Sequence, residues 1–170
     1  LVEFSDNLFL EFTASRRPDG VVVLIFEDVT PRIRAERRIL HMVRYDPLTG
    51  LPNREFFVES VQDWFRRHDG GGKVGFLILD VDEFKHVNGD RLLCRVADEL
   101  QRIVGDATIV GRLMGDQFVL FFPDEGGVDL DARIRETHEA ICGFYEVDGT
   151  TFRVSFSAGY VVLGSDEFRQ

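Results

Sequence analysis

Residues 74–81 read Val-Gly-Phe-Leu-Ile-Leu-Asp-Val, an almost continuous apolar run of strand length. Such a run is typical of a strand that is buried on both faces, because a strand with one solvated face alternates apolar and polar residues. We therefore expect this strand at the centre of a sheet, with other elements packed on both sides. Asp80 and Asp82 lie where the strand emerges from the predicted core, which makes its end a candidate for chemistry.

The segments around this strand follow a regular order of helices and strands. Apolar residues recur at helical spacing, for example at Phe57, Val61 and Trp64. The patterns predict helices over about 53–68, 90–104 and 130–141, strands over about 108–113 and 118–122, and a last strand or strands within 152–162. This order predicts an α+β fold whose central, mainly antiparallel sheet is flanked by helices.

Residues 1–30 form a separate pattern, in which apolar runs at 8–13 and 21–27 flank Pro18-Asp19-Gly20. Proline presets φ and glycine accepts positive φ, so this tripeptide predicts the turn of a β-hairpin. An isolated hairpin is only marginally stable in water, and we expect this one to belong to a larger sheet.

Residues 31–45 predict a connecting helix. Thr30 is a favoured N-cap, and the proline that follows it suits the first helical position. Ile33, Leu40 and Val43 fall on one side of this helix. Two interpretations stay open: the helix pairs with its twin in a homodimer, or it is a plain surface helix.

The composition narrows the classes of function. The chain of 170 residues carries a net charge of −10, which disfavours binding to a phosphate backbone, so we expect no nucleic-acid partner. No apolar run reaches the roughly 18 residues of a membrane helix, and no signal peptide is recognised. Cys94 and Cys142 are in no metal-ligand spacing. We expect a cytoplasmic protein, with tethering to a membrane through an upstream region as an alternative.

Asp80 and Asp116 are the strongest candidates for chemistry. Asp116 lies in the turn between two predicted strands, and the two carboxylates meet at one end of the sheet if β-strands 74–81 and 118–122 are neighbours. Two carboxylates without a neutralising lysine repel each other unless a cation lies between them. Oxygen ligands at a strand end, together with a triphosphate, are typical of a Mg²⁺ site. The Asp-x-Asp pattern alone more often simply ends a strand, whereas its combination with the hairpin favours the metal site.

Four short motifs follow one another along the chain. They read Asp-Pro-Leu-Thr-Gly-Leu-Pro-Asn-Arg at 46–54, Leu-Asp-Val-Asp-Glu-Phe-Lys-His-Val-Asn at 79–88, Arg-Leu-Met-Gly-Asp-Gln-Phe at 112–118 and Ser-Phe-Ser-Ala-Gly-Tyr at 155–160. Together they resemble the GGDEF domains, the diguanylate cyclase family. Upstream, Phe-Glu-Asp-Val-Thr-Pro at 26–31 resembles the end of a PAS sensor domain. The resemblance divides the chain into a PAS-like hairpin at 1–30, a signalling helix at 31–45 and a C-terminally truncated GGDEF domain at 46–170.

The resemblance implies a palm-like sheet and a homodimer that condenses two GTP molecules to cyclic di-GMP and pyrophosphate. It implies two Mg²⁺ ions on the triphosphate, held by Asp80, the backbone carbonyl of Val81 and Asp116. The other positions that the family's motifs assign to the site are Asp116 and Gln117 for catalysis, and Lys85, Asn88, Asp90 and Gly115 for substrate binding. Lys85 would contact the terminal phosphate, and Asn88 and Asp90 would bind the guanine edge.

Three departures from the family pattern bear directly on the predicted site. Met114 stands where the family has glycine, and a positive φ there would cost about 1 kcal/mol. Gln117 replaces the second acidic residue and removes one charge from the predicted metal site. Asn88 and Asp90 are two positions apart, seven fewer than in the family pattern. Either the guanine pocket is shortened or the chain as given lacks a loop.

These departures favour a degenerate GTP-binding domain that links a PAS sensor to a downstream effector, such as an EAL phosphodiesterase. An active diguanylate cyclase is the first alternative, because Asp80, Asp116 and Lys85 are all present. A dimerisation module that binds no nucleotide is the second.

Overall fold

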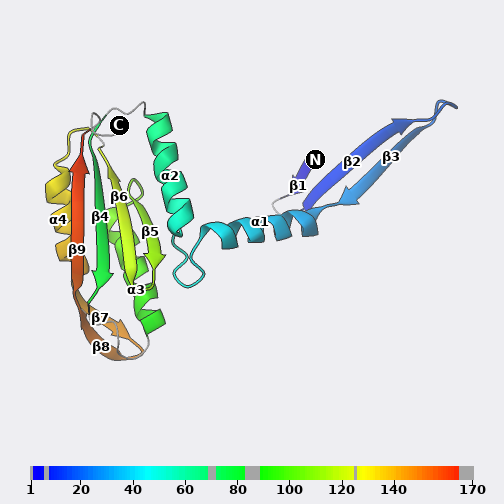
Figure 1. The fold of residues 1–170 in the computed structure, drawn as a ribbon. Helices are drawn as coiled ribbons and strands as arrows, with labels where there is room; N and C mark the ends of the chain where they lie inside the picture. Colours follow the sequence, from blue (N-terminus) through cyan, green and yellow to red (C-terminus); the bar gives the residue numbers. More distant parts are fainter. Residues whose placement is uncertain (1, 6–7, 69–71, 83–88, 125, 165–170) are drawn as a thin grey trace. The chain divides into compact units, whose positions relative to one another are not determined.

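The computed structural model describes residues 2–5, 8–68, 72–82, 89–124 and 126–164. The chain divides into two compact units, residues 1–43 and 44–170 (Figure 1). None of the helices in the described ranges combines the length and the apolar character that crossing a bilayer requires.

A three-stranded antiparallel sheet makes up most of the first unit. Its strands, in the spatial order β1-β2-β3, are β1 Val2–Ser5, β2 Leu8–Arg16 and β3 Val22–Asp28. Between β2 and β3, Gly20 donates its N–H to the carbonyl of Arg17 at 2.9 Å and has a φ of 85°, which closes the hairpin that the sequence predicts. The strand β1 was not predicted, and it shows that the hairpin belongs to a larger sheet.

The helix α1, Thr30–Arg44, follows β3. The carboxylate of Asp28 accepts the N–H of Thr30 at 2.9 Å, so Asp28 takes the capping role that was expected of Thr30. The Thr30 hydroxyl instead accepts the N–H of Phe9 at 2.8 Å and ties the start of the helix to β2. Hydrogen bonding from Thr30 also holds the pKa of Asp28 below its usual value.

The second unit is built on a four-stranded antiparallel sheet with the order β5-β6-β4-β9. Its strands are β4 Val74–Val81, β5 Ile109–Met114, β6 Gln117–Pro123 and β9 Phe156–Leu163. A separate hairpin consists of β7 Gly143–Val147 and β8 Thr150–Val154. Because β4 pairs with β6 on one side and β9 on the other, its predicted central place is confirmed. The strand β7 was not predicted, whereas the strand structure expected within 152–162 is present as two strands, β8 and β9.

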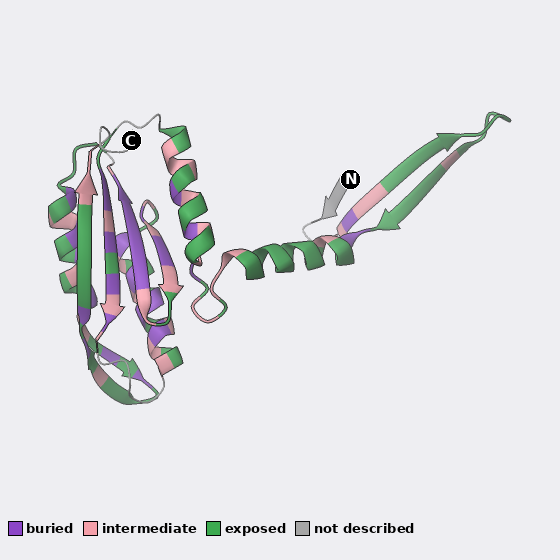
Figure 2. Cartoon of the chain, viewed as in Figure 1, coloured by how far each residue is buried: buried purple, intermediate pink, exposed green. Residues whose placement is uncertain are grey.

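Helices pack against both faces of this sheet, although the outer strand β9 stays largely exposed (Figure 2). The helices α3 Gly89–Val104 and α4 Leu130–Ile141 pack on one face, and α2 Arg54–Arg67 packs on the other. At the start of α2, the Asn53 side chain accepts the N–H of Phe56 at 2.9 Å, which confirms the predicted start of this helix. This is the α+β, palm-like arrangement that the sequence predicts.

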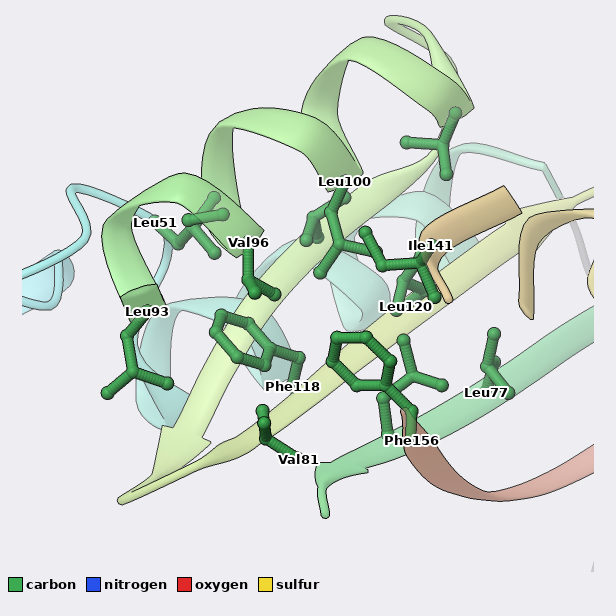
Figure 3. Packing of buried hydrophobic residues seen from close by; sticks show 14 of the residues in the cluster. Leu51, Leu77, Val81, Leu93, Val96, Leu100, Phe118, Leu120, Ile141 and Phe156 are labelled. Carbon is green, nitrogen blue, oxygen red and sulfur yellow. The ribbon is translucent and has the colours of Figure 1, made fainter. Parts of the chain in front are cut away.

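Alternate residues of β4 point into two separate cores, which explains its continuous apolar sequence. The larger core joins β4, β6 and β9 to α3 and α4, and includes Leu77, Leu93, Leu100, Phe118 and Phe156 (Figure 3). On the other face, Val74 packs with Phe57 of α2, and both are buried. Full burial of a side chain of this size contributes roughly 1.5–3 kcal/mol. Near the end of β4, Ile78 is 46% exposed, so the burial of both faces holds only for the first part of the strand.

Candidate functional site

The end of β4 and the turn between β5 and β6 lie side by side. Asp80 is opposite Gln117 in the register of β4 and β6. One residue further, the N–H of Val81 donates to the carbonyl of Asp116 at 3.3 Å. The structure therefore brings together Asp80, Val81 and Asp116, the residues that the sequence analysis selected as metal ligands.

Gly115 provides the left-handed residue of this turn. It has a φ of 55°, and a Cβ at this position would meet no atom within 4 Å, so its conformation and not crowding favours glycine. Among the described residues, the only residue other than glycine with positive φ is Asp148. The backbone strain that a positive φ would cause at Met114 is therefore absent, because Gly115 takes the turn and Met114 stays in β5 with a side chain that is 68% exposed.

Gln117 is bound directly to the predicted metal ligand Asp80. Its Nε2 donates to Asp80 Oδ2 at 2.9 Å. The amide thus occupies one acceptor oxygen of the carboxylate, where an acidic side chain would instead repel it. The loss of charge at this position was predicted from the sequence, but the hydrogen bond was not.

Arg112 holds the turn from within the sheet. Its Nε and Nη2 both donate to the carbonyl of Gly115, at 2.9 and 2.6 Å. Its N–H donates to the carbonyl of Pro52 at 2.9 Å, so the turn is also tied to the loop that carries the first motif. Arg112 belongs to the third motif, but no role was predicted for it. The sequence signal for this contact was that Arg112 stands three residues before Gly115, within reach of the turn.

Asp46 is the acidic partner of this arginine. It also accepts the N–H and the hydroxyl of Thr49, both at 2.8 Å. Burial raises the pKa of Asp46, but hydrogen bonds from Arg112 and Thr49 outweigh burial and hold the pKa below its usual value. The first motif is thus folded around one ionised carboxylate.

Asp82, the second acid of the Asp-x-Asp pattern, faces two serines. Hydrogen bonds from the hydroxyls of Ser157 and Ser155 lower its pKa. No role was predicted for Asp82 beyond ending the strand. The serines at alternate positions of the fourth motif were a signal that a polar partner lies opposite them.

The predicted nucleotide-binding residues are only partly described. Asp90 is exposed in the first turn of α3, and Gly115 is exposed in the hairpin turn. Lys85 and Asn88 lie outside the described residues, as does the join of Asn88 to Gly89 that bears on the length of the guanine pocket.

The donors at the end of β4 fit a small divalent cation. Carboxylate and carbonyl oxygens are the ligands that Mg²⁺ prefers, and Mg²⁺ completes its octahedron with water and phosphate oxygens. Within the described ranges, no group of three or more His, Cys, Asp and Glu side chains gathers. A cation here would therefore depend on Asp80, Asp116 and the carbonyl of Val81, with one oxygen of Asp80 already bound to Gln117.

Known proteins resemble both the sequence and the fold. The family described as "Diguanylate cyclase, GGDEF domain" matches residues 43–169. The diguanylate cyclase DgcP of Pseudomonas aeruginosa is 35% identical over 133 residues, which cover 72% of this chain and 20% of that protein. The cyclic di-GMP phosphodiesterase NbdA of the same species is 35% identical over 95 residues, covering 49% of this chain and 12% of that protein. The chain thus spans a fifth or less of the length of these two relatives.

A solved structure supports the fold independently. The coiled coil and GGDEF domain of DgcB from Caulobacter crescentus, in complex with c-di-GMP, matches with a TM-score of 0.66 and 21% identity. The match covers 80% of this chain and 78% of that one. Since the family match extends over most of the second unit and the four motifs lie inside it, this chain belongs to the GGDEF family of diguanylate cyclase domains.

Proposed function

We propose that this domain binds GTP with a divalent cation at the end of β4 and acts in cyclic di-GMP signalling as a regulatory module with little or no cyclase activity. The observation that carries the proposal is the hydrogen bond from Gln117 Nε2 to Asp80 Oδ2 at 2.9 Å. Glutamine at position 117 removes the second acid of the motif, and its hydrogen bond uses one acceptor position on the Asp80 carboxylate. The carboxylates of Asp80 and Asp116 remain for one cation.

Electrostatics explains why binding and turnover separate here. Asp80, Asp116 and the Val81 carbonyl would hold one cation, and Lys85, Asn88, Asp90 and Gly115 would contact the nucleotide by their places in the family motifs. A bound cation neutralises the phosphates and polarises the reacting phosphorus centre. A two-metal site needs carboxylate ligands for both ions, and a neutral amide at 117 supplies no charge for the second. We therefore expect nucleotide binding to persist while catalysis is weak.

The test uses the full chain with GTP and Mg²⁺. A fluorescent GTP analogue should bind in a Mg²⁺-dependent manner, and Asp116→Asn should weaken that binding about tenfold or more, because a charged ligand is lost. Chromatography should detect no cyclic di-GMP above a protein-free control. Asp98→Asn, a change of the same kind at an exposed position of α3, serves as the control and should bind like wild type. Absence of binding in the wild-type chain would contradict the proposal and favour a module without nucleotide.

Active cyclase is the second candidate function. It is favoured by the retention of Asp80 on β4 and of Asp116 next to Gly115 in the turn between β5 and β6, the strand that pairs with β4. Steady formation of cyclic di-GMP from GTP by the wild-type chain, lost in Asp116→Asn, would establish this function in place of the first.

The first unit gives the proposed domain its input. We propose that β1 to β3 are the end of a PAS sensor and that α1 carries the signal in a homodimer. On α1, Ile39, Leu40 and Met42 are between 55% and 68% exposed, which is costly for apolar side chains unless a second helix covers them. One relative is named a cyclic di-GMP phosphodiesterase, NbdA, and we propose an EAL phosphodiesterase domain as the effector of this protein. Because GTP is the proposed ligand, we propose the cytoplasm as the compartment in which this domain acts.

A further inference from the structure

Asp82 makes three hydrogen bonds to the start of β9 and the residue before it. Its Oδ2 accepts the hydroxyl of Ser155 at 2.9 Å, and its Oδ1 accepts the hydroxyl of Ser157 at 2.6 Å. Its backbone N–H donates to the carbonyl of Ser155 at 2.9 Å. Both carboxylate oxygens and the main chain of one residue thus hold β4 against β9 at the end where the cation is proposed to bind.

These contacts fix the direction of the carbonyl of Val81. This carbonyl and the N–H of Asp82 belong to one peptide group, and a planar trans peptide points them in opposite directions. Since the N–H is directed at Ser155 beside β9, the carbonyl is directed away from β9, toward the β6 side of β4. The N–H of Val81, which donates to the carbonyl of Asp116, lies on that same β6 side.

Both oxygens of Asp82 are engaged by hydroxyls, so this carboxylate differs from Asp80, which is bonded to a single amide. Ser157 lies opposite Asp80 in the register of β4 and β9. One of the two serines that bind Asp82 is therefore the cross-strand partner of Asp80, a predicted metal ligand. Any movement of β9 at this point would be transmitted to both the side chain of Asp80 and the peptide after Val81.

We infer that Asp82 is a positioning residue, which clamps β4 to β9 through Ser155 and Ser157 and thereby aims the Val81 carbonyl at the divalent cation. The inference rests on the proposed cation binding at Asp80 and Asp116 and adds a part of the site that the motifs leave without a role. Asp82 acts through hydrogen-bond geometry and not as a ligand or through its charge. Partners that orient a metal ligand typically change metal affinity 10- to 100-fold when they are removed.

The experiment separates geometry from charge by titrating the full chain with Mn²⁺ in the presence of GTP. Binding of the ion is measured by calorimetry and by its electron paramagnetic resonance. Asp82→Ala removes both the charge and the hydrogen bonds from the two serines. We expect its dissociation constant for Mn²⁺ to rise about tenfold. Asp82→Asn removes the charge but keeps a carbonyl acceptor and an amide donor, and a serine hydroxyl can serve as either partner. We expect Asp82→Asn to bind Mn²⁺ within about twofold of wild type. The double change Ser155→Ala with Ser157→Ala keeps the charge and should behave like Asp82→Ala.

The controls keep folding apart from positioning. Ser60→Ala in α2, whose hydroxyl donates to the carbonyl of Phe56 at 2.7 Å, is the matched loss of a serine hydroxyl and should leave Mn²⁺ affinity unchanged. Amide hydrogen exchange without metal should be faster at residue 82 in Asp82→Ala and in the double serine variant, but not in Asp82→Asn. This readout reports on the clamp even if Asp82→Ala lowers overall stability.

Two results would overturn the inference while leaving the proposed function standing. One is Mn²⁺ affinity in Asp82→Ala equal to wild type; the other is a loss in Asp82→Asn as large as in Asp82→Ala, which would show that the charge matters. Failure of the wild-type chain to bind Mn²⁺ in the presence of GTP would instead overturn the proposed function, and the inference with it.

Discussion

Arg112 Nη1 donates to Asp46 Oδ1 at 2.7 Å, in an ion pair whose side chains are only 11% and 20% exposed. The pair links the first motif of the domain to the hairpin that carries Asp116. Because water screens it poorly, this pair differs from the other ion pairs of the described chain, in which the side chains are between 32% and 71% exposed. It is therefore the ion pair from which we expect a measurable contribution to stability.

Arg112→Gln should lower the free energy of unfolding by about 2 kcal/mol, because it leaves the Asp46 carboxylate and the Gly115 carbonyl without charged donors. Urea denaturation measures the change. Arg66→Gln is the matched control, since Arg66 pairs with Asp63 on the exposed side of α2. The control should change stability by no more than about 0.5 kcal/mol. Equal losses in both variants would show that burial of the Arg112 pair has no special weight.

The lowered pKa of Asp46 predicts a specific dependence of stability on pH. A folded-state pKa below the unfolded value of about 3.9 means that the unfolded chain binds the proton first as the pH falls. The stabilisation from the ionised carboxylate is therefore complete above about pH 5 and is lost as the pH falls through and below 4. Between pH 5 and 3, wild type should lose more stability than Asp46→Asn in urea titrations. Parallel profiles for the two proteins would exclude Asp46 as a source of acid sensitivity.

Gln117→Glu tests the role of the amide at the candidate cation site. Without a divalent ion, the new carboxylate faces Asp80 instead of donating to it, so we expect a lower melting temperature than wild type. With Mg²⁺ the order should reverse, because a ligand that binds only the folded state stabilises by about 2.7 kcal/mol at 100 times its dissociation constant. Thermal unfolding of both proteins with EDTA and with Mg²⁺ gives the melting temperatures without and with the ion. A Mg²⁺ effect no larger than in wild type would mean that residue 117 does not influence cation binding.

Leu40→Asp tests the proposed pairing of α1. Leu40 is 55% exposed, so the change should alter the stability of a single chain by no more than about 0.5 kcal/mol. If α1 pairs with its twin, the added charge should convert dimer to monomer in light scattering. Arg38→Asp, two residues away on the same helix, introduces the same side chain and should leave the dimer intact. A wild-type chain that is monomeric at high concentration would refute the pairing.

The helices and strands that could be predicted from the sequence are those that form because of their own local residue pattern. β4 was predictable because alternate residues face two cores, and α2 because Asn53 caps it and Phe57 lies on its apolar face. The four motifs predicted the family. β7 was missed because Gly143–Val147 is short and follows the end of α4 without a turn of its own. Its partner β8, and not its own composition, makes it a strand.

The candidate site was predicted in its residues but not in its contacts. The neighbourhood of Asp80 and Asp116 follows from the order of the motifs, whereas the bond of Gln117 to Asp80 depends on the register of β4 and β6. Strain at Met114 depended on a positive φ at that residue, and the positive φ lies at Gly115 instead. Contacts that join residues far apart in sequence cannot be inferred from local spacing.

The most direct test of the account is a crystal structure of the full chain grown with Mn²⁺ and a GTP analogue that cannot be hydrolysed, with an anomalous difference map for manganese. The account predicts one manganese peak within coordination distance of the carboxylates of Asp80 and Asp116 and of the Val81 carbonyl, with the triphosphate on the same ion. A bound nucleotide without manganese at these residues, or manganese bound elsewhere in the domain, would contradict it.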